Sequence, residues 1–404
     1  MGAPAMPAAA PAKPAGLALP RNPVLGWASF TGARHAGVPS VGDLLHTQLV
    51  TSGRAALHAA LLQLQLLPGS AVLVPSYHCP TMVAPIVHAG LTPRCYAIGE
   101  DGLPQLDRLD TPGASPAGAL IVAHLFGLPQ DLGAVRAWCD ARGVPLLEDC
   151  AHSYFGMAGS RPVGTWGDYA IASLTKFLPV PELGLLGSHR HPLRPMHLAP
   201  QGGRAQLKAW IDALEVAARF GRPAGLAGAL RLLMALKNAR RSPSSAAKPA
   251  LAVPGDTSDG SAARMLAACD MTRASAAPLL LSTGLYRHLP LRRIVLRRQQ
   301  NFDRLSAALA GLPRTCLLMP RRADTHAPYL VPLWVDDAER VYHGLRAQGL
   351  PVLRWDRRWP GTHMSAHDTG LDWGLHLLQL PCHQDMTPQD IDRVALQLQS
   401  QLLA

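Results

Sequence analysis

Residues 51–57 begin with Thr-Ser-Gly-Arg and continue into an apolar helical pattern. The free N–H groups at the start of a helix form an anion site. Gly53 would let a ligand approach this site closely, and Ser52 would add a hydroxyl group to it. This segment could therefore hold a phosphate. An ordinary capped helix start has the same pattern, so the segment alone does not separate the two interpretations.

A carboxylate and an amine follow two apolar runs that are typical of buried strands. Asp149 ends residues 145–149, where a desolvated carboxylate needs a cationic partner. A pyridinium nitrogen would serve, and so would a structural hydrogen-bond network. Lys176 follows residues 168–172, where its surroundings can lower its pKa and make it a Schiff-base amine. The alternative is a surface lysine whose stem packs against the sheet.

The elements that must position these residues alternate regularly between residues 45 and 190. Strand-like runs occupy residues 71–75, 94–98, 119–124 and 145–149, and helical stretches occupy residues 55–67, 81–89 and 131–142. The alternation predicts βαβ units on a mostly parallel sheet. Ligands of such sheets lie at the carboxyl ends of the strands, which is where Asp149 and Lys176 fall.

Composition divides the chain into three parts. Residues 1–20, rich in Ala and Pro, predict a flexible tail, and residues 21–265 predict a large domain. That domain includes a basic helical insertion and a mobile loop at about 200–265. Residues 266–404 predict a connecting helix and a smaller C-terminal α/β domain. The elements expected there are a basic helix at 287–309, strands at 329–335 and 351–354, and a helix at 338–348.

The overall composition is that of a globular protein. The chain has 404 residues, of which 48% are hydrophobic and 16% charged, and this balance excludes wholesale disorder. Seven cysteines without a CxxC pair, and histidines without zinc spacing, indicate reduced thiols and no metal site. No uncharged apolar run approaches the roughly 18 residues of a membrane span, and five prolines interrupt the first 20 residues. We therefore expect a cytoplasmic protein.

The positive charge is concentrated in one segment. The formal net charge is +11, and residues 187–300 alone hold 18 basic and 5 acidic residues. No nucleic-acid-binding motif accompanies this patch, so we expect no nucleic-acid partner. The apolar stripes within residues 200–265 predict packing against the body or a dimer partner. The alternative is peripheral contact of this basic amphipathic segment with an anionic membrane.

The order and spacing of the motifs resemble the DegT/DnrJ/EryC1/StrS family of sugar aminotransferases. The matching motifs are residues 52–57, 74–77, 89–93, 124–127, 148–152, 167–168, 173–176 and 380–383. The resemblance implies a fold-type-I, pyridoxal-phosphate-dependent transferase. Its large domain would hold a mixed, mostly parallel sheet flanked by helices, and it would be completed by the smaller C-terminal domain. It also implies a homodimer.

The resemblance implies roles for individual residues. Lys176 matches the lysine that binds pyridoxal 5'-phosphate covalently and moves the substrate proton. Asp149 matches the acid that keeps the pyridine nitrogen protonated, and His152 stands near the cofactor's phenolic oxygen, where most members have Gln. The positions that match phosphate contacts are Ser52, Gly53, Arg54 and Ser173.

Several positions depart from the family pattern. Cys79 stands where an aromatic ring usually stacks on the cofactor, and His78 could stack instead. The glycine-rich stretch after the lysine is reduced at residues 181–184, and residues 271–273, which match a segment that reaches the partner's cofactor, lack the usual Asn. The arginines and tryptophan at 357–359, with His363, could line a sugar-nucleotide pocket or form an ordinary surface loop.

The expected activity is transfer of an amino group, from glutamate, to a keto-sugar nucleotide in polysaccharide or glycan biosynthesis. One alternative is a catalytically impaired binding or regulatory protein with the same fold. Another is a pyridoxal-phosphate enzyme that acts on a non-sugar substrate.

Overall fold

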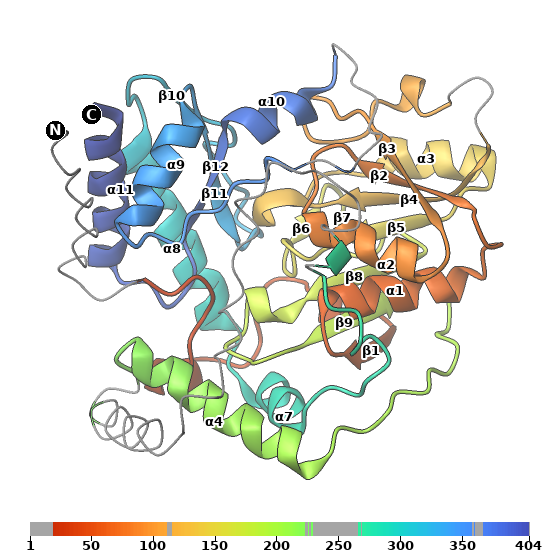
Figure 1. Ribbon diagram of the computed structural model, residues 1–404, viewed down its shortest axis with the longest axis horizontal. Helices are drawn as coiled ribbons and strands as arrows, with labels where there is room; N and C mark the ends of the chain where they lie inside the picture. The colour runs from red at the N-terminus through yellow and green to blue at the C-terminus, as the bar shows by residue number, and fades with distance from the viewer. Residues whose placement is uncertain are drawn as a thin grey trace, which may run out of the picture.

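The computed structural model of this chain describes residues 19–110, 115–222, 225, 228, 266, 267, 269–357, 359 and 367–403. Two sheets stand side by side in it, a seven-stranded sheet and a three-stranded sheet (Figure 1). An apolar core extends from the large sheet into the small one. Most of the expected tail at 1–20, the expected loop near 240–263 and His363 lie outside the described residues.

The large sheet is mixed and mostly parallel, as expected. Its strand order is β1-β9-β8-β5-β4-β2-β3, in which β9 runs antiparallel to β8 and β1 antiparallel to β9. The other neighbouring pairs are parallel. The strands are β1 His46–Val50, β2 Ala71–Pro75, β3 Thr92–Tyr96, β4 Ala117–Ala123, β5 Leu146–Asp149, β8 Tyr169–Ser173 and β9 Gly184–Ser188. Every residue of β2, β5 and β9 is buried, which is typical of a sheet covered on both faces.

Helices α1 (Gly53–Leu64), α2 (Val83–His88) and α3 (Gly133–Arg142) belong to this part of the chain. The α1 helix begins at Ser52 because its side chain accepts a hydrogen bond of 3.2 Å from the N–H of Ala55. It ends at Gln65, which adopts the left-handed conformation. The predicted elements are therefore present, with boundaries displaced by a few residues.

The small sheet is antiparallel and consists of β10 (Thr315–Leu317), β11 (Leu330–Val335) and β12 (Leu377–Pro381). Helices α8 (Arg292–Leu309) and α9 (Ala338–Ala347) pack against β11, and α11 (Pro388–Leu403) packs across both helices (Figure 1). The strand expected at 351–354 is wrong. Only one isolated bridge forms there, between Leu353 and Gln379, before the chain turns into the pocket described below.

The single basic helix expected at 287–309 is two helices, α7 (Leu280–His288) and α8. Pro290 lies between them, and proline has no N–H to continue a helix. The remaining elements are the hairpin β6 Met157–Ala158 and β7 Arg161–Pro162, helix α10 Thr369–His376, and short 3-10 turns at Trp27–Phe30, Val41–Asp43, Pro80–Met82, Leu106–Arg108, Leu125–Gly127 and Leu174–Lys176.

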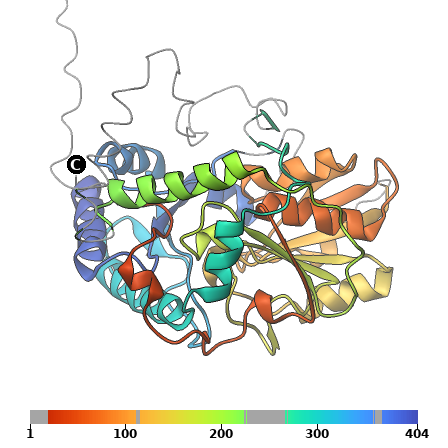
Figure 2. The ribbon, with the colours of Figure 1, turned by 90° about the horizontal axis from the view of Figure 1, so that it is seen from below.

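Helix α4 (Gly203–Arg219) lies across the molecule beside α7 (Figure 2). Its buried residues are the small side chains Ala209, Ala217 and Ala218. Leu207 and Trp210 belong to the apolar stripes that were expected to pack against the body or a dimer partner, and they are 63% and 50% exposed in the single chain. Among the described residues, no helix has the length and apolar character needed to cross a membrane.

Candidate active site

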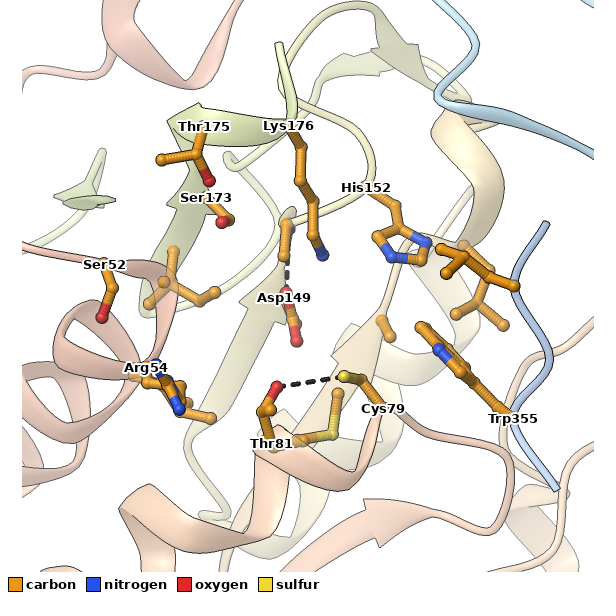
Figure 3. Close-up of a pocket in the computed structure, with 18 of the residues that line it drawn as sticks. Ser52, Arg54, Cys79, Thr81, Asp149, His152, Ser173, Thr175, Lys176 and Trp355 are labelled. Atoms are coloured by element: carbon orange, nitrogen blue, oxygen red, sulfur yellow. Dashed lines mark hydrogen bonds between the residues drawn. The ribbon is translucent and has the colours of Figure 1, made fainter. Parts of the chain in front are cut away.

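A cavity of about 360 Å³ lies at the carboxyl ends of the central strands of the large sheet (Figure 3). It collects eight of the nine predicted site residues: Ser52, Gly53, Arg54, Cys79, Asp149, His152, Ser173 and Lys176. These residues come from four separate stretches of sequence, 52–54, 79, 149–152 and 173–176. The parallel strands bring them together because their carboxyl ends meet at one edge of the sheet.

The first turn of α1 forms one wall of the cavity. The N–H groups of Gly53 and Arg54 have no partner within the helix, since the Ser52 hydroxyl and carbonyl accept from Ala55 and Ala56. Strand β9 approaches this turn so closely that a Cβ on Gly184 would lie 2.1 Å from the Ser52 carbonyl oxygen. The glycine at 184 is therefore required. The turn, flanked by Arg54, has the donors and positive charge that a phosphate needs.

Asp149 ends β5 beside this turn and is buried. It accepts a hydrogen bond of 2.8 Å from the N–H of Ala151. Burial raises the pKa of Asp149, and the positive charge of Lys176 counteracts part of that rise. A buried carboxylate with one remaining acceptor oxygen is suited to an N–H donor such as a protonated pyridine.

Lys176 enters the cavity from the turn after β8. Burial lowers its pKa, and Arg21 lowers it further, whereas Cys79 and Asp149 raise it. Its Nζ lies 5.3 Å from the centre of the Tyr329 ring. A lysine whose pKa is lowered in this way holds a larger fraction of neutral, nucleophilic amine.

His152 faces the cavity between two aromatic rings. Its ring centre lies 4.5 Å from that of Tyr329 and 5.0 Å from that of Trp355. Nδ1 accepts from the N–H of Phe126 at 3.4 Å, and burial holds the pKa of His152 well below its usual range. The ring is therefore neutral with its proton on Nε2, which can donate a hydrogen bond to an oxygen in the cavity.

His78, the ninth predicted residue, is not among those that line the cavity. Its side chain is buried, and Nδ1 lies 2.8 Å from the carbonyl oxygen of Pro75, to which it donates. The neighbouring Cys79 does face the cavity and lies 3.0 Å from the hydroxyl of Thr81 (Figure 3). The ring expected from His78 is thus absent from that face, and Trp355 is the tryptophan that enters the cavity.

The two departures from the family pattern after Lys176 meet in the structure. Glu182, in the altered stretch 181–184, is buried and accepts from the N–H of Leu279 at 2.8 Å. The guanidinium of Arg273 donates to Glu182 and, at 2.7 Å, to Gln201. Arg273 is therefore paired within its own chain. Glu182 connects the turn before β9 to the start of α7 and to residue 273.

His124, Glu148 and Cys150 are the described residues whose ligand atoms lie close enough together to hold a metal ion. The ligand atoms of His124 and Glu148 already form hydrogen bonds within the protein. Nε2 of His124 lies 2.9 Å from Glu148, whose carboxylate also accepts from the N–H groups of Gly164 at 2.9 Å and Gly167 at 2.5 Å. This group fixes the turns behind Asp149 and needs no ion to satisfy it.

The cavity also contains residues that the sequence does not predict, among them Arg21, Thr81, Thr175 and Trp355. Arg21 and Trp355 reach the cavity from the start of the chain and from the loop after residue 353. No local pattern marks such long-range approaches. Arg357, which was considered for a sugar-nucleotide pocket, does line the cavity, whereas Trp359 is not among its lining residues.

Residues 41–185 match the model of the DegT/DnrJ/EryC1/StrS aminotransferase family, so the resemblance is confirmed for this part of the chain. A curated relative from Acidithiobacillus ferrooxidans, UDP-N-acetyl-3-dehydro-alpha-D-glucosamine 3-aminotransferase, is 30% identical over 162 residues. These cover 38% of this chain and 42% of that protein. The dTDP-3-amino-3,4,6-trideoxy-alpha-D-glucose transaminase of Streptomyces venezuelae is 34% identical over 35% of this chain and 37% of its own length. The matched part thus spans less than half of these relatives.

Solved structures match over more of the chain. NtdA from Bacillus subtilis, solved with bound cofactor PMP, has a TM-score of 0.56 and 16% identity. The match covers 89% of this chain and 73% of that one. At this identity the likeness concerns the fold. The expected α/β fold, with a mostly parallel mixed sheet flanked by helices as in aminotransferases, is confirmed.

Proposed function

We propose that this protein is a pyridoxal-phosphate-dependent aminotransferase that moves an amino group from glutamate to a keto-sugar nucleotide. One observation carries the proposal. Lys176, Asp149 and the first turn of α1 meet in one cavity at the carboxyl ends of the parallel strands. An amine, a buried acid and an anion cradle are the three groups that pyridoxal phosphate requires of its protein.

The residues present fit that cofactor. The free N–H groups of the α1 turn, with Arg54 and Ser173, would hold its phosphate, and Asp149 would accept from its ring nitrogen. When bound, the cofactor supplies a protonated ring that stabilises negative charge on the substrate carbon. Lys176 would move the proton at that carbon, and Nε2 of His152 would donate to an oxygen on the ring.

The substrate class is supported by the relatives, whose names specify UDP-linked and dTDP-linked sugars. Arg357 adds a cationic group to the cavity wall, which suits the phosphates of a nucleotide. The glutamate donor and a place in glycan biosynthesis follow from the family resemblance.

An amino-transfer assay tests this proposal. Protein loaded with pyridoxal phosphate would be mixed with L-glutamate and with UDP-, dTDP- or GDP-linked 4-keto and 3-keto sugars. We expect 2-oxoglutarate and an amino sugar to form in equal amounts, and none with Lys176→Ala. Transfer to simple keto acids but to no sugar nucleotide would favour the enzyme with a non-sugar substrate.

We further propose that the protein acts in the cytoplasm as a homodimer. Support comes from α4, where Leu207 and Trp210 are exposed and would be covered by a second copy. Light scattering of the full chain and of Trp210→Asp tests this, and we expect the variant to shift toward monomer. If both remain dimeric, α4 is not in the interface, and flotation with anionic vesicles then tests membrane contact through residues 200–265.

A further inference from the structure

The N-terminal segment brings a cation to the active-site cavity. Arg21 lines the cavity together with Lys176 and His152, although it lies far from both in the sequence. Its side chain is exposed, and among the described residues no hydrogen bond or ion pair engages its guanidinium. Of the two carboxylates that line the cavity, Asp149 is fixed by Ala151, and Asp356 lies 3.6 Å from Arg354.

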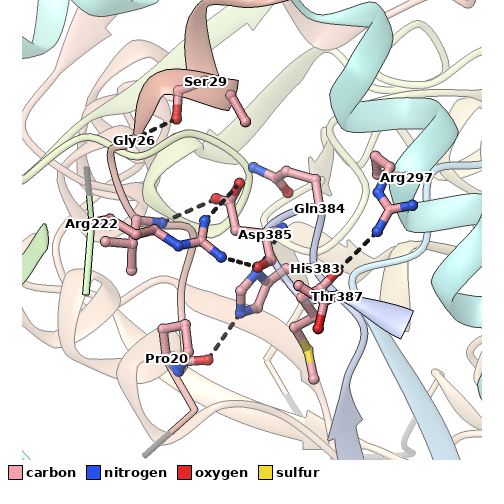
Figure 4. A network of polar contacts seen from close by, with 12 residues as sticks. Pro20, Gly26, Ser29, Arg222, Arg297, His383, Gln384, Asp385 and Thr387 are labelled. Atoms are coloured by element: carbon pink, nitrogen blue, oxygen red, sulfur yellow. Dashed lines mark hydrogen bonds and ion pairs between the residues drawn. The ribbon is translucent and has the colours of Figure 1, made fainter. Parts of the chain in front are cut away.

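The backbone on both sides of Arg21 is held in place by buried groups. The carbonyl oxygen of Pro20 accepts from Nε2 of His383 at 2.9 Å, and the N–H of Val24 donates to Asp385 at 3.1 Å (Figure 4). His383 and Asp385 are 2% and 3% exposed. The segment is therefore anchored across the C-terminal part of the chain, and Arg21 is presented at a defined place.

Asp385 is itself fixed by two cations from different elements. Arg222, after α4, lies 3.4 Å from its carboxylate (Figure 4). Arg293 on α8 lies 3.1 Å from the same carboxylate. Burying a carboxylate is unfavourable unless it is paired and hydrogen-bonded. Because Asp385 is buried and paired with two arginines, its carboxylate is held in one position. It therefore fixes the backbone of the segment that carries Arg21.

Position and charge together define what Arg21 can bind. The α1 turn and Arg54 would hold the cofactor's phosphate, so Arg21 is available for another anion in the same cavity. Burial is the main cause of the lowered pKa values of Lys176 and His152, and the positive charge of Arg21 lowers both pKa values further. A guanidinium presents paired N–H donors that match the two oxygens of a carboxylate or phosphate.

We propose that Arg21 binds an oxyanion of the substrate, and this inference rests on the aminotransferase function proposed above. The anion is either the carboxylate of the amino donor or the diphosphate of the nucleotide-linked acceptor. The carboxylate is planar and the phosphate groups are tetrahedral, but each presents two oxygens to which a guanidinium can donate paired hydrogen bonds. Arg21 is accordingly a substrate-binding residue supplied by the segment 19–24.

Two unreactive probes distinguish these sources. Isothermal titration would measure binding of glutarate, a dicarboxylate without an amino group, and of UDP to protein loaded with pyridoxal phosphate. Wild type would be compared with Arg21→Ala and Arg21→Lys. The matched control is Arg34→Ala, which removes another exposed arginine of the same N-terminal region that does not line the cavity.

We expect Arg21→Ala to weaken binding of one probe about tenfold or more, the usual effect of losing a charged hydrogen-bond donor. Arg21→Lys should recover part of it, and Arg34→Ala should bind as wild type. Loss for glutarate identifies the donor carboxylate, and loss for UDP identifies the acceptor diphosphate. Unchanged binding of both probes by Arg21→Ala, or an equal loss in Arg34→Ala, would overturn the inference.

The result for Arg21 can be distinguished from the result for the proposed aminotransferase function. Wild-type protein that reacts covalently with pyridoxal phosphate but binds neither probe would refute the role of Arg21 and leave the aminotransferase proposal standing. Protein that fails to react with the cofactor would refute the aminotransferase proposal, whatever Arg21 does.

Discussion

The guanidinium of Arg298 donates a hydrogen bond of 2.6 Å to the backbone carbonyl oxygen of Lys176. Arg298 is fully buried on α8, and its other bonds go to the carbonyl of Pro328 at 3.0 Å and the side chain of Gln384 at 2.9 Å. Burial lowers its pKa to about 10. A buried cation hydrogen-bonded to neutral acceptors thus connects the turn that carries Lys176 to the C-terminal part of the chain.

Replacing Arg298 by Met should destabilise the protein strongly. Three acceptors would lose their donor, and each buried unsatisfied group costs about 1–3 kcal/mol, so we expect the free energy of unfolding to fall by about 3 kcal/mol or more. Urea unfolding measures this. Arg304→Met, which removes a half-exposed arginine paired with Asp392, should change stability only slightly, because exposed ion pairs are screened by water. Equal effects of the two variants would contradict the role of Arg298.

Replacing Asp149 by Asn should lower the pKa of Lys176 further. Burial already lowers it, and the carboxylate counteracts this by stabilising the charged amine. Without that carboxylate, the neutral amine should form at lower pH. Modification of Lys176 by a small aldehyde can be trapped with borohydride and followed by mass spectrometry. Its rate should therefore rise at a lower pH in Asp149→Asn than in wild type. Asp212→Asn, on α4, is the control. If the rate in Asp149→Asn instead rose only at a higher pH than in wild type, this electrostatic explanation would be refuted.

A methyl group at Gly184 should disrupt the α1 turn, which we propose binds the cofactor's phosphate. A Cβ there would meet the backbone of Ser52 at 2.1 Å, so either β9 or the α1 turn must move. We expect a loss of about 1–3 kcal/mol in unfolding free energy and weaker binding of pyridoxal phosphate. Gly284→Ala lies in α7, where a Cβ would meet nothing within 4 Å. It should be neutral or stabilising, and destabilisation equal to that of Gly184→Ala would argue against the close approach.

The anchor of the N-terminal segment should fail in acid. Burial lowers the pKa of His383 to about 4, so the unfolded chain takes up a proton at this residue more readily than the folded one. Its stabilising contribution is complete above pH 6.5 and is lost as the pH falls from 6.5 toward 4. The loss amounts to about 3 kcal/mol of unfolding free energy. His383→Gln should flatten the pH dependence over this range, whereas His197→Gln, an exposed histidine, should not. An unchanged slope in His383→Gln would show that other groups cause it.

Much of the large sheet follows from local pattern. The apolar runs at 71–75 and 145–149 are the strands β2 and β5 to within one residue, because a strand buried on both faces must be apolar throughout. The rule that places ligands at the carboxyl ends of parallel strands then brings Asp149 and Lys176 into one cavity. The pattern at 287–309 predicts one helix, whereas α7 ends at His288 and α8 begins at Arg292, on either side of Pro290.

Contacts between distant parts of the chain could not be predicted in this way. The carbonyl oxygen of Pro20 accepts a hydrogen bond from His383, which is 363 residues away in the sequence. The loop that carries Trp355 reaches the cavity through tertiary packing. Neither position therefore has a local sequence signal. The resemblance suggests that the ring of His78 could replace the aromatic residue missing at Cys79, yet these two consecutive side chains point in different directions. Its ring is bonded to the backbone of Pro75, while Cys79 faces the cavity.

The central claim is that Lys176 binds pyridoxal phosphate covalently, and the visible absorption spectrum tests it most directly. Purified protein would be mixed with the cofactor, scanned before and after borohydride, and digested for mass spectrometry. Lys176→Ala and Lys208→Ala, the latter an exposed lysine on α4, would be treated alike. We predict a visible band in wild type and Lys208→Ala that borohydride removes, with the reduced cofactor attached at residue 176, and no band in Lys176→Ala. Absence of the band in wild type would contradict the account and favour a binding or regulatory protein with an aminotransferase fold.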